Sequence, residues 1–193
     1  MASVVLSGDT SGSVTIAAPA VAGSNTQTLV AATGTLAPLI SGTAVTASST
    51  SVDFTSIPSW AKRITVMLTG VSTSGTSNLI LQLGTGSTTY TTTGYLGACG
   101  YIAASSAAAT AMSTGFMFNN LVSAANVHSG ILAVSLLTGN TWSFSGNCAR
   151  QADTLVCASA GSIPLAAALT AVRITTVNGT DTFDAGTINI LYE

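Results

Sequence analysis

The sequence predicts an all-β protein, either an antiparallel β-sandwich or a jelly roll, and three observations lead to this prediction. Only 5% of the 193 residues are charged, while Thr, Val, Ser and Gly are frequent, and such a composition favours strands and turns over helices. Apolar and polar residues alternate in several short runs, as they do in half-buried strands. The length suits one domain of ordinary size, with or without an appended arm.

The first 48 residues are predicted to form an extended N-terminal arm. They hold short β-like fragments, such as 14–16 and 27–30, that Gly and Pro interrupt. Fragments this short do not form a stable sheet alone, so they need the main domain, other subunits or a larger assembly as partners; a disordered linker is the alternative. The predicted domains are therefore an arm over 1–48 and a β-sandwich over 49–193.

Residues 50–97 are predicted to contain the framework hairpin of the sandwich. In the run 64–68, alternate apolar residues share one face, because successive strand side chains point to opposite sides. After a turn rich in Ser, Thr and Gly at 72–77, the run 79–83 repeats the pattern. Two such runs around a Gly-containing turn are typical of an antiparallel hairpin.

The C-terminal part of the chain echoes this stretch. Arg-Ile-Thr at 173–175 repeats 63–65, and the residues from 186 to 191 resemble those from 75 to 80. Matched hairpins are what the paired sheets of a sandwich need. We therefore expect Arg63 and Arg173 at related positions. Their candidate ion-pair partners are Asp53, Asp181 and Asp184.

The remaining chain is predicted to complete a set of six to nine strands. The runs 131–137 and 141–144 are expected to form a second hairpin across a Gly-Asn turn, since both residues tolerate positive φ. Residues 103–111, AASSAAATA, are predicted to form a loop, and residues 150–164 a polar connection. Residues 165–193 are expected to supply the last strands.

The sequence offers few groups for catalysis, with six acidic residues and one histidine. His128 has no second His or C-x-x-C motif to complete a zinc site. Asp181 and Asp184 are close enough in sequence to consider a glycosidase carboxylate pair, but a hairpin turn in which Asp181 accepts backbone hydrogen bonds is the simpler account. We predict no enzyme activity, no cofactor and no metal site.

The three cysteines, Cys99, Cys148 and Cys157, show no metal-binding or redox spacing. Their odd number argues against a complete disulfide framework. Free buried thiols are expected, and a Cys148–Cys157 disulfide stays open.

Charge and hydropathy exclude several kinds of partner. A net charge of −2 with four basic residues gives no electrostatic footprint for nucleic acid, and no long apolar run suggests a membrane span. The start of the chain lacks the features of a signal peptide, so we expect assembly in a cytoplasm. Because interface cores are depleted of charge, the low charge indicates obligate oligomerisation, with a monomeric secreted β protein as the competitor.

Four aromatic residues are candidates for binding. Tyr90, Tyr95 and Tyr101 lie among Thr and Gly, a composition typical of adaptable binding loops, although loop tyrosines also support folds. Trp142, in the second hairpin, is the fourth candidate, since aromatic rings stack on sugars.

Three stretches of the sequence resemble one family. They are VDFTSIPSWAKRITVMLTGVSTSGTSN (52–78), TTGYLG (92–97) and AVRITTVNGTDTFDAGTINILYE (171–193), and the segment 7–29 adds to them. They are similar to a β-structured domain of tailed-bacteriophage virion proteins of the tail-fibre-like type, over most of the chain except roughly 98–165. The motifs carry no catalytic residue.

The resemblance implies a homotrimeric virion protein assembled in the host cytoplasm. Its N-terminal part would attach to capsid or tail proteins, and its β-domain would project outward. Because the chain has no shaft repeats, a short fibre or a capsid decoration (cement) protein is expected rather than a long fibre. The alternative is a tail-fibre receptor-binding protein that recognises a host surface glycan.

Overall fold

The computed structural model describes residues 3–7, 11–17, 38–120, 122–124, 126–151 and 154–193. The chain divides into two compact units, Met1–Leu36 and Ala37–Glu193. The described residues form strands and no helix, which confirms the all-β prediction. Accordingly, none of them belongs to a helix long and apolar enough to cross a membrane.

The described residues of the N-terminal unit form an antiparallel hairpin. Its strands are β1 (Ser3–Ser7) and β2 (Ser13–Ala17), with Val5 opposite Thr15. The side chains of Val4, Val5, Leu6 and Ile16 are all more than half exposed. The hairpin therefore leaves these four apolar side chains uncovered. The part of the predicted arm over 18–37 lies outside the described residues.

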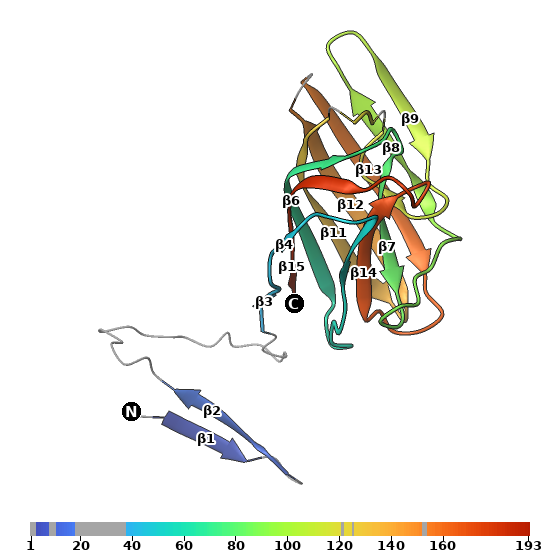
Figure 1. Cartoon of the computed structure of the whole chain (residues 1–193). Coiled ribbons are helices and arrows are strands. Elements are labelled where there is room, and N and C mark those ends of the chain that lie inside the picture. Colours follow the sequence, from blue (N-terminus) through green and yellow to red (C-terminus); the bar gives the residue numbers. More distant parts are fainter. Residues whose placement is uncertain (1–2, 8–10, 18–37, 121, 125, 152–153) are drawn as a thin grey trace. The chain divides into compact units, whose positions relative to one another are not determined.

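The second unit contains a four-stranded and a nine-stranded sheet (Figure 1). The smaller sheet has the order β10-β7-β14-β5, with strands Phe116–Met117, Leu79–Gly84, Ala171–Thr176 and Ser51–Phe54. The larger has the order β3-β15-β6-β11-β12-β13-β8-β9, and β4 also pairs with β15. Its strands in chain order are β3 (Ile40–Ser41), β4 (Val45–Thr46), β6 (Arg63–Thr73), β8 (Leu96–Ile102), β9 (Ala107–Ala111), β11 (His128–Thr138), β12 (Thr141–Arg150), β13 (Leu155–Pro164) and β15 (Phe183–Tyr192).

The two sheets enclose one apolar core, as expected for a β-sandwich. Phe116 of the small sheet stacks on Phe144 of the large one, with ring centroids 4.5 Å apart and planes 5° apart. Tyr95 packs edge-on against Phe116 at 4.8 Å. Strands β3 and β4 lie within the range that the sequence assigned to the arm, and both pair with β15.

The predicted framework hairpin is wrong, because β6 and β7 belong to different sheets. The segment between them crosses from one sheet to the other. The segment between β14 and β15 also connects the two sheets. The two similar stretches of sequence pair with each other, since β6 pairs with β15 and β7 pairs with β14. The two similar stretches therefore each connect one sheet to the other, and neither forms a hairpin.

Two further segments were assigned wrongly from the sequence. Residues 107–111 form β9 instead of a loop, and residues 155–164 form β13 instead of a polar connection. The sequence did not reveal these two strands because Ala and Ser differ little in hydrophobicity, so the alternation of apolar and polar residues is weak. Their pairing with neighbouring strands decides the structure. The hairpin of β11 and β12 is confirmed, with Gly139 at φ 55° in its turn.

Candidate interaction surface

The side of the nine-stranded sheet opposite to the core is the most distinctive surface of the second unit. We call it the outer face. Along β11, β12 and β13, buried side chains alternate with exposed or half-buried ones, and the latter make up this face. Two cross-strand rows run over it. The first is Leu191, Thr65, Ala133, Ser145, Ala160, Ala98 and Ala111, and the second is Asn189, Met67, Ile131, Asn147, Ala158, Gly100 and Ala109.

No side chain in these two rows carries a charge. The nearest cation along β6 is Arg63 at its start, which forms an ion pair with Glu193. A solvent-exposed sheet face normally carries polar and charged side chains. The core of a protein interface, by contrast, is depleted of charge. In its lack of charge, the outer face therefore resembles the core of a protein interface.

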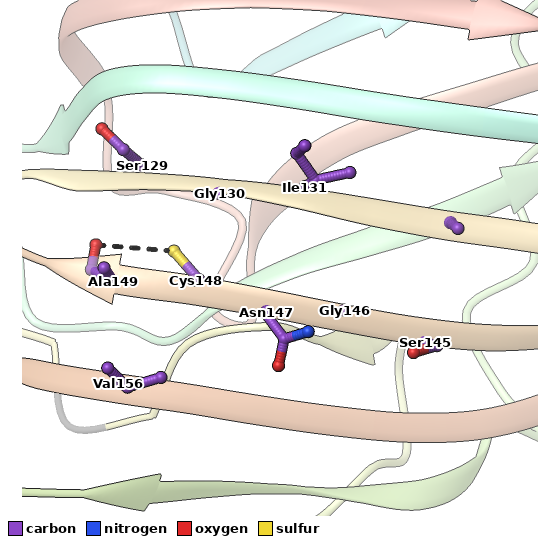
Figure 2. Close-up of a pocket in the computed structure, with 10 residues that line it drawn as sticks. Ser129, Gly130, Ile131, Ser145, Gly146, Asn147, Cys148, Ala149 and Val156 are labelled. Atoms are coloured by element: carbon purple, nitrogen blue, oxygen red, sulfur yellow. Dashed lines mark hydrogen bonds between the residues drawn. The ribbon is translucent and has the colours of Figure 1, made fainter.

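The outer face holds an open hollow of about 500 Å³ over β11, β12 and β13 (Figure 2). Ile131 and Val156 are among its lining side chains, together with Ser129, Ser145 and Asn147. The backbone of Gly146 also lines the hollow, and a Cβ on it would point to the core side, 2.7 Å from the buried Leu132 Cδ2. A flat face with a shallow hollow suits contact with another sheet or protein better than enclosure of a small ligand.

The sheet ends at β9, which pairs with β8 on one side only. All five of its residues, Ala107–Ala111, are exposed, and none is charged or proline. Natural edge strands are usually protected by charges, Pro, bulges or a covering segment. This edge has neither charge nor Pro, so it is open to pairing with another chain.

The structure places the four predicted aromatic residues at separate positions. Tyr90 lies under the Arg173 guanidinium, whose Cζ is 4.0 Å from the ring centroid. Tyr101 is on β8 and packs against the core, and Trp142 is buried on β12. Tyr95 is 2% exposed. These four residues do not form a common stacking surface.

Arg173 also confirms one of the expected ion pairs. Its Nε and Nη2 donate to the two carboxylate oxygens of Asp53 at 2.8 and 2.6 Å. Burial is the main cause that raises the pKa of Tyr90, and the nearby Asp53 carboxylate raises it further. Arg63, which the sequence placed with the same acids, pairs instead with Glu193. The group of Tyr90, Asp53 and Arg173 ties β5 to β14.

Tyr95 stabilises the fold through its hydroxyl. The Leu83 N–H donates to Tyr95 Oη at 2.8 Å, and Oη donates to the Thr91 carbonyl at 3.0 Å. Burial raises the pKa of Tyr95 to about 12. The loop tyrosine that looked available for binding is therefore a core residue.

We expect Tyr95→Phe to lower the free energy of unfolding by about 1 to 2 kcal/mol at neutral pH, because the hydroxyl contacts are lost. Since the folded-state pKa lies above the unfolded value of about 10, the stabilisation is complete below pH 10 and is lost as the pH rises toward about 12. Denaturant unfolding from pH 8 to 12 measures this. A variant that loses stability with pH as steeply as the unmodified chain would contradict the assignment.

The two aspartates considered for catalysis have separate structural partners. Asp181 accepts hydrogen bonds from Ser77 N–H at 2.9 Å and from Asn178 Nδ2 at 2.7 Å, and these bonds lower its pKa. Asp184 accepts a hydrogen bond from the Ser72 hydroxyl. Asp181 thus joins the segment between β14 and β15 to the segment between β6 and β7. The sequence correctly predicted that Asp181 accepts a backbone hydrogen bond, but the donor, Ser77, lies in the segment between β6 and β7 and not in Asp181's own turn.

His128 is fully buried, and its Nδ1 lies 3.0 Å from the Val71 carbonyl oxygen. This contact ties β11 to β6 beside the register shift between those strands. Among the described residues, no cluster of three or more His, Cys, Asp or Glu side chains could hold a metal ion.

The three cysteines are free and buried, as the sequence predicts. Cys148 and Cys157 are directly opposite on β12 and β13, and Cys99 lies on the neighbouring strand β8. Burial raises the pKa of Cys148 to about 12, and a hydrogen bond with Cys157 together with burial raises that of Cys99. Since the thiolate is the reactive form, Cys99 and Cys148 are inert in the folded protein.

A hydrogen bond with Cys99 lowers the pKa of Cys157 to about 7, but all three thiols are at most 2% exposed. We therefore expect an aromatic disulfide reagent to leave them unmodified in the folded protein and to titrate all three cysteines after unfolding without reductant. The increase in absorbance of the released thiolate measures the count. Only one reactive thiol after unfolding would show that a Cys148–Cys157 disulfide forms instead.

Comparison of the chain with models of known families, with curated proteins and with solved structures finds no match.

Proposed function

We propose that this protein is a non-enzymatic structural subunit of a tailed-bacteriophage particle, either a short trimeric fibre or a capsid decoration protein. The observation that carries the proposal is the uncharged outer face, because the core of a protein interface is depleted of charged residues. The similarity of the segments 52–78 and 171–193 to tailed-bacteriophage virion proteins is the reason for proposing a phage particle. In this proposal the outer face is covered by other copies of the chain.

The size of the outer face supports a copy-to-copy contact. With strands about 4.8 Å apart and residues about 3.3 Å apart along each strand, its uncharged part covers on the order of 500 Å² per copy. Three copies around a threefold axis would bury about 1,500 Å² in total, divided among three contacts. Small side chains, such as Ala98, Ala158 and Ala160, allow backbones to approach closely around a threefold axis.

The N-terminal unit supports attachment to other virion proteins. An isolated two-stranded hairpin is marginally stable in water, and β1 and β2 leave Val4, Leu6 and Ile16 more than half exposed. Burial of each such side chain is worth about 1.5 to 3 kcal/mol. The hairpin therefore gains most of its stability from a partner, which in this proposal is a capsid or tail protein.

The proposal is tested by locating the chain. Particles are purified by density gradient from cells that carry the gene within its phage genome, and their proteins are identified by mass spectrometry. We expect the chain in the particle fraction, and we expect a variant lacking residues 1–36 to be absent from particles while still accumulating in the cells. A full-length chain that stays entirely in the soluble fraction would overturn the proposal.

A further inference from the structure

The free edge of the nine-stranded sheet is β9, the outermost strand on its side (Figure 1). Among the described residues, β9 pairs with β8 and with no other strand. A strand at a sheet edge presents backbone N–H and C=O groups that can pair with another chain. The local hydrogen bonds show which residues of β9 carry these groups and which partner fits them.

Two hydrogen bonds flank the ladder between β8 and β9 and fix its pattern. Ala103 N–H donates to the Ser106 carbonyl at 2.9 Å, next to the turn between the strands. Met112 N–H donates to the Gly97 carbonyl at 3.0 Å, at the other end. Both pairs continue the register of the β8–β9 ladder. They are therefore hydrogen-bonded pairs of the same ladder.

Hydrogen-bonded and non-hydrogen-bonded pairs alternate along an antiparallel ladder. Within β9, Ala108 and Thr110 consequently exchange their backbone bonds with β8. The N–H and C=O groups of Ala107, Ala109 and Ala111 point away from β8 to the free edge. No described residue forms a backbone hydrogen bond with them on that side.

We propose that β9 pairs in antiparallel orientation with β9 of a second copy of the chain, about a twofold axis at Ala109. In this register Ala109 lies opposite its own equivalent, and Ala107 lies opposite Ala111 of the second copy. Each of these three pairs exchanges two bonds, so the contact has six backbone hydrogen bonds. All outward groups of one strand thus meet the outward groups of the other, as an isologous contact requires.

The side chains of β9 permit this approach. Ala107, Ala109 and Ala111 place only methyl groups on the outer face, and on the opposite side Ala108 would lie beside Thr110 of the second copy. Like charges directly opposite each other destabilise paired strands, but β9 has no charge, and all five of its residues are exposed. The edge of one copy therefore fits the edge of another.

The pairing adds to the contact through the outer face and does not depend on the proposed virion role. Five residues give a shared edge about 16 Å long, which buries much less than the about 1,000 Å² of a stable interface. The contact is therefore weak at micromolar concentration, where it leaves the mass of the protein unchanged. It forms where copies of the chain are concentrated.

An engineered cysteine tests the pairing. The full-length chain with Ala109→Cys is kept at millimolar concentration with copper phenanthroline as the oxidant, and linked dimers are separated by electrophoresis without reductant. The Cα atoms of a hydrogen-bonded pair are about 5.5 Å apart, a distance that a disulfide spans. We expect Ala109→Cys to form linked dimers. The three native cysteines are buried and do not contribute.

Two matched controls on the same strand test the register. In Ala107→Cys alone or Ala111→Cys alone, the two equivalent residues would lie about 13 Å apart, four residues along the strand. We expect neither variant to give more linked dimer than the unmodified chain. An equal mixture of the two variants is expected to link, because residue 107 of one copy then faces residue 111 of the other.

Two further changes separate edge pairing from contact through the outer face. Ala109→Pro, added to both members of the mixture, removes an outward N–H but no bond to β8, and edge strands tolerate Pro. We expect the linkage to be lost while the circular dichroism spectrum is kept. Ala158→Lys, which disrupts the proposed outer-face contact, is expected to leave the linkage unchanged.

Three results would overturn the proposal. Ala109→Cys that links no more than the unmodified chain means that β9 does not pair with a second copy. Ala107→Cys that links to itself means a different register or orientation. Linkage that Ala158→Lys removes means that the outer face, and not the edge, brings the residues together. Absence of the chain from phage particles would change none of these readouts.

Discussion

Lysine in place of Ala158 is expected to dissociate the proposed trimer into folded monomers. Ala158 is exposed in the second row of the outer face, between Asn147 and Gly100. In a separate subunit the new ammonium group reaches water and costs little. In an interface it is buried without a partner, at a cost of several kcal/mol. Light scattering coupled to size-exclusion chromatography measures the mass, and circular dichroism measures the fold.

Thr88→Lys is the matched control for this variant. Thr88 is exposed in the segment between β7 and β8, away from the two rows of the outer face, so the same added charge stays in water. We expect this control to keep the mass of the unmodified chain. If Ala158→Lys also keeps that mass, the outer face is not the interface between copies.

Alanine in place of Gly186 is expected to destabilise the sandwich strongly. Gly186 lies in β15 with φ at 97°, and a Cβ there would lie 2.5 Å from the backbone N and Cα of Val71. The β15–β6 register shifts on both sides of Ala185, so the two backbones approach closely here. Because backbone atoms cannot yield as a side-chain end can, we expect a loss of about 3 kcal/mol or more in the free energy of unfolding.

Gly70→Ala provides the control for Gly186→Ala. Gly70 lies on the facing strand β6 and also has positive φ, at 66°, but a Cβ there meets only the Cα of Gly186, at 3.9 Å. The cost is therefore that of the left-handed conformation, about 1 kcal/mol. Denaturant unfolding at one protein concentration compares the variants. Equal losses would show that the backbone of β15 moves away to make room.

The sequence predicted those parts of the fold that depend on local pattern. The all-β class followed from composition, and the β11–β12 hairpin followed from its alternation and its Gly-Asn turn. The β6–β7 hairpin was wrong because alternation shows that a segment is a strand but does not identify its partner. All six residues of β7 are buried. The apolar alternation in its sequence therefore did not correspond to one buried and one exposed face.

The candidate interface could be predicted only in part. Low charge indicated that some surface is buried between copies, but locating that surface required β9 and β13, whose alanines and serines hide the strand period. The aromatic residues were misleading for a related reason. Tyr95 has loop-like neighbours in sequence, yet its hydroxyl accepts the Leu83 N–H in the core. Trp142, also named as a binding candidate, is likewise buried.

The most direct test of the proposed assembly is the mass of the unmodified chain in solution. Sedimentation equilibrium at micromolar concentration measures it without reference to shape. We expect a single species of three times the 19.0 kDa of one chain, which Ala158→Lys converts to monomer. A stable species of 19.0 kDa at that concentration would contradict it, because the uncharged outer face would then be exposed to water in the native protein.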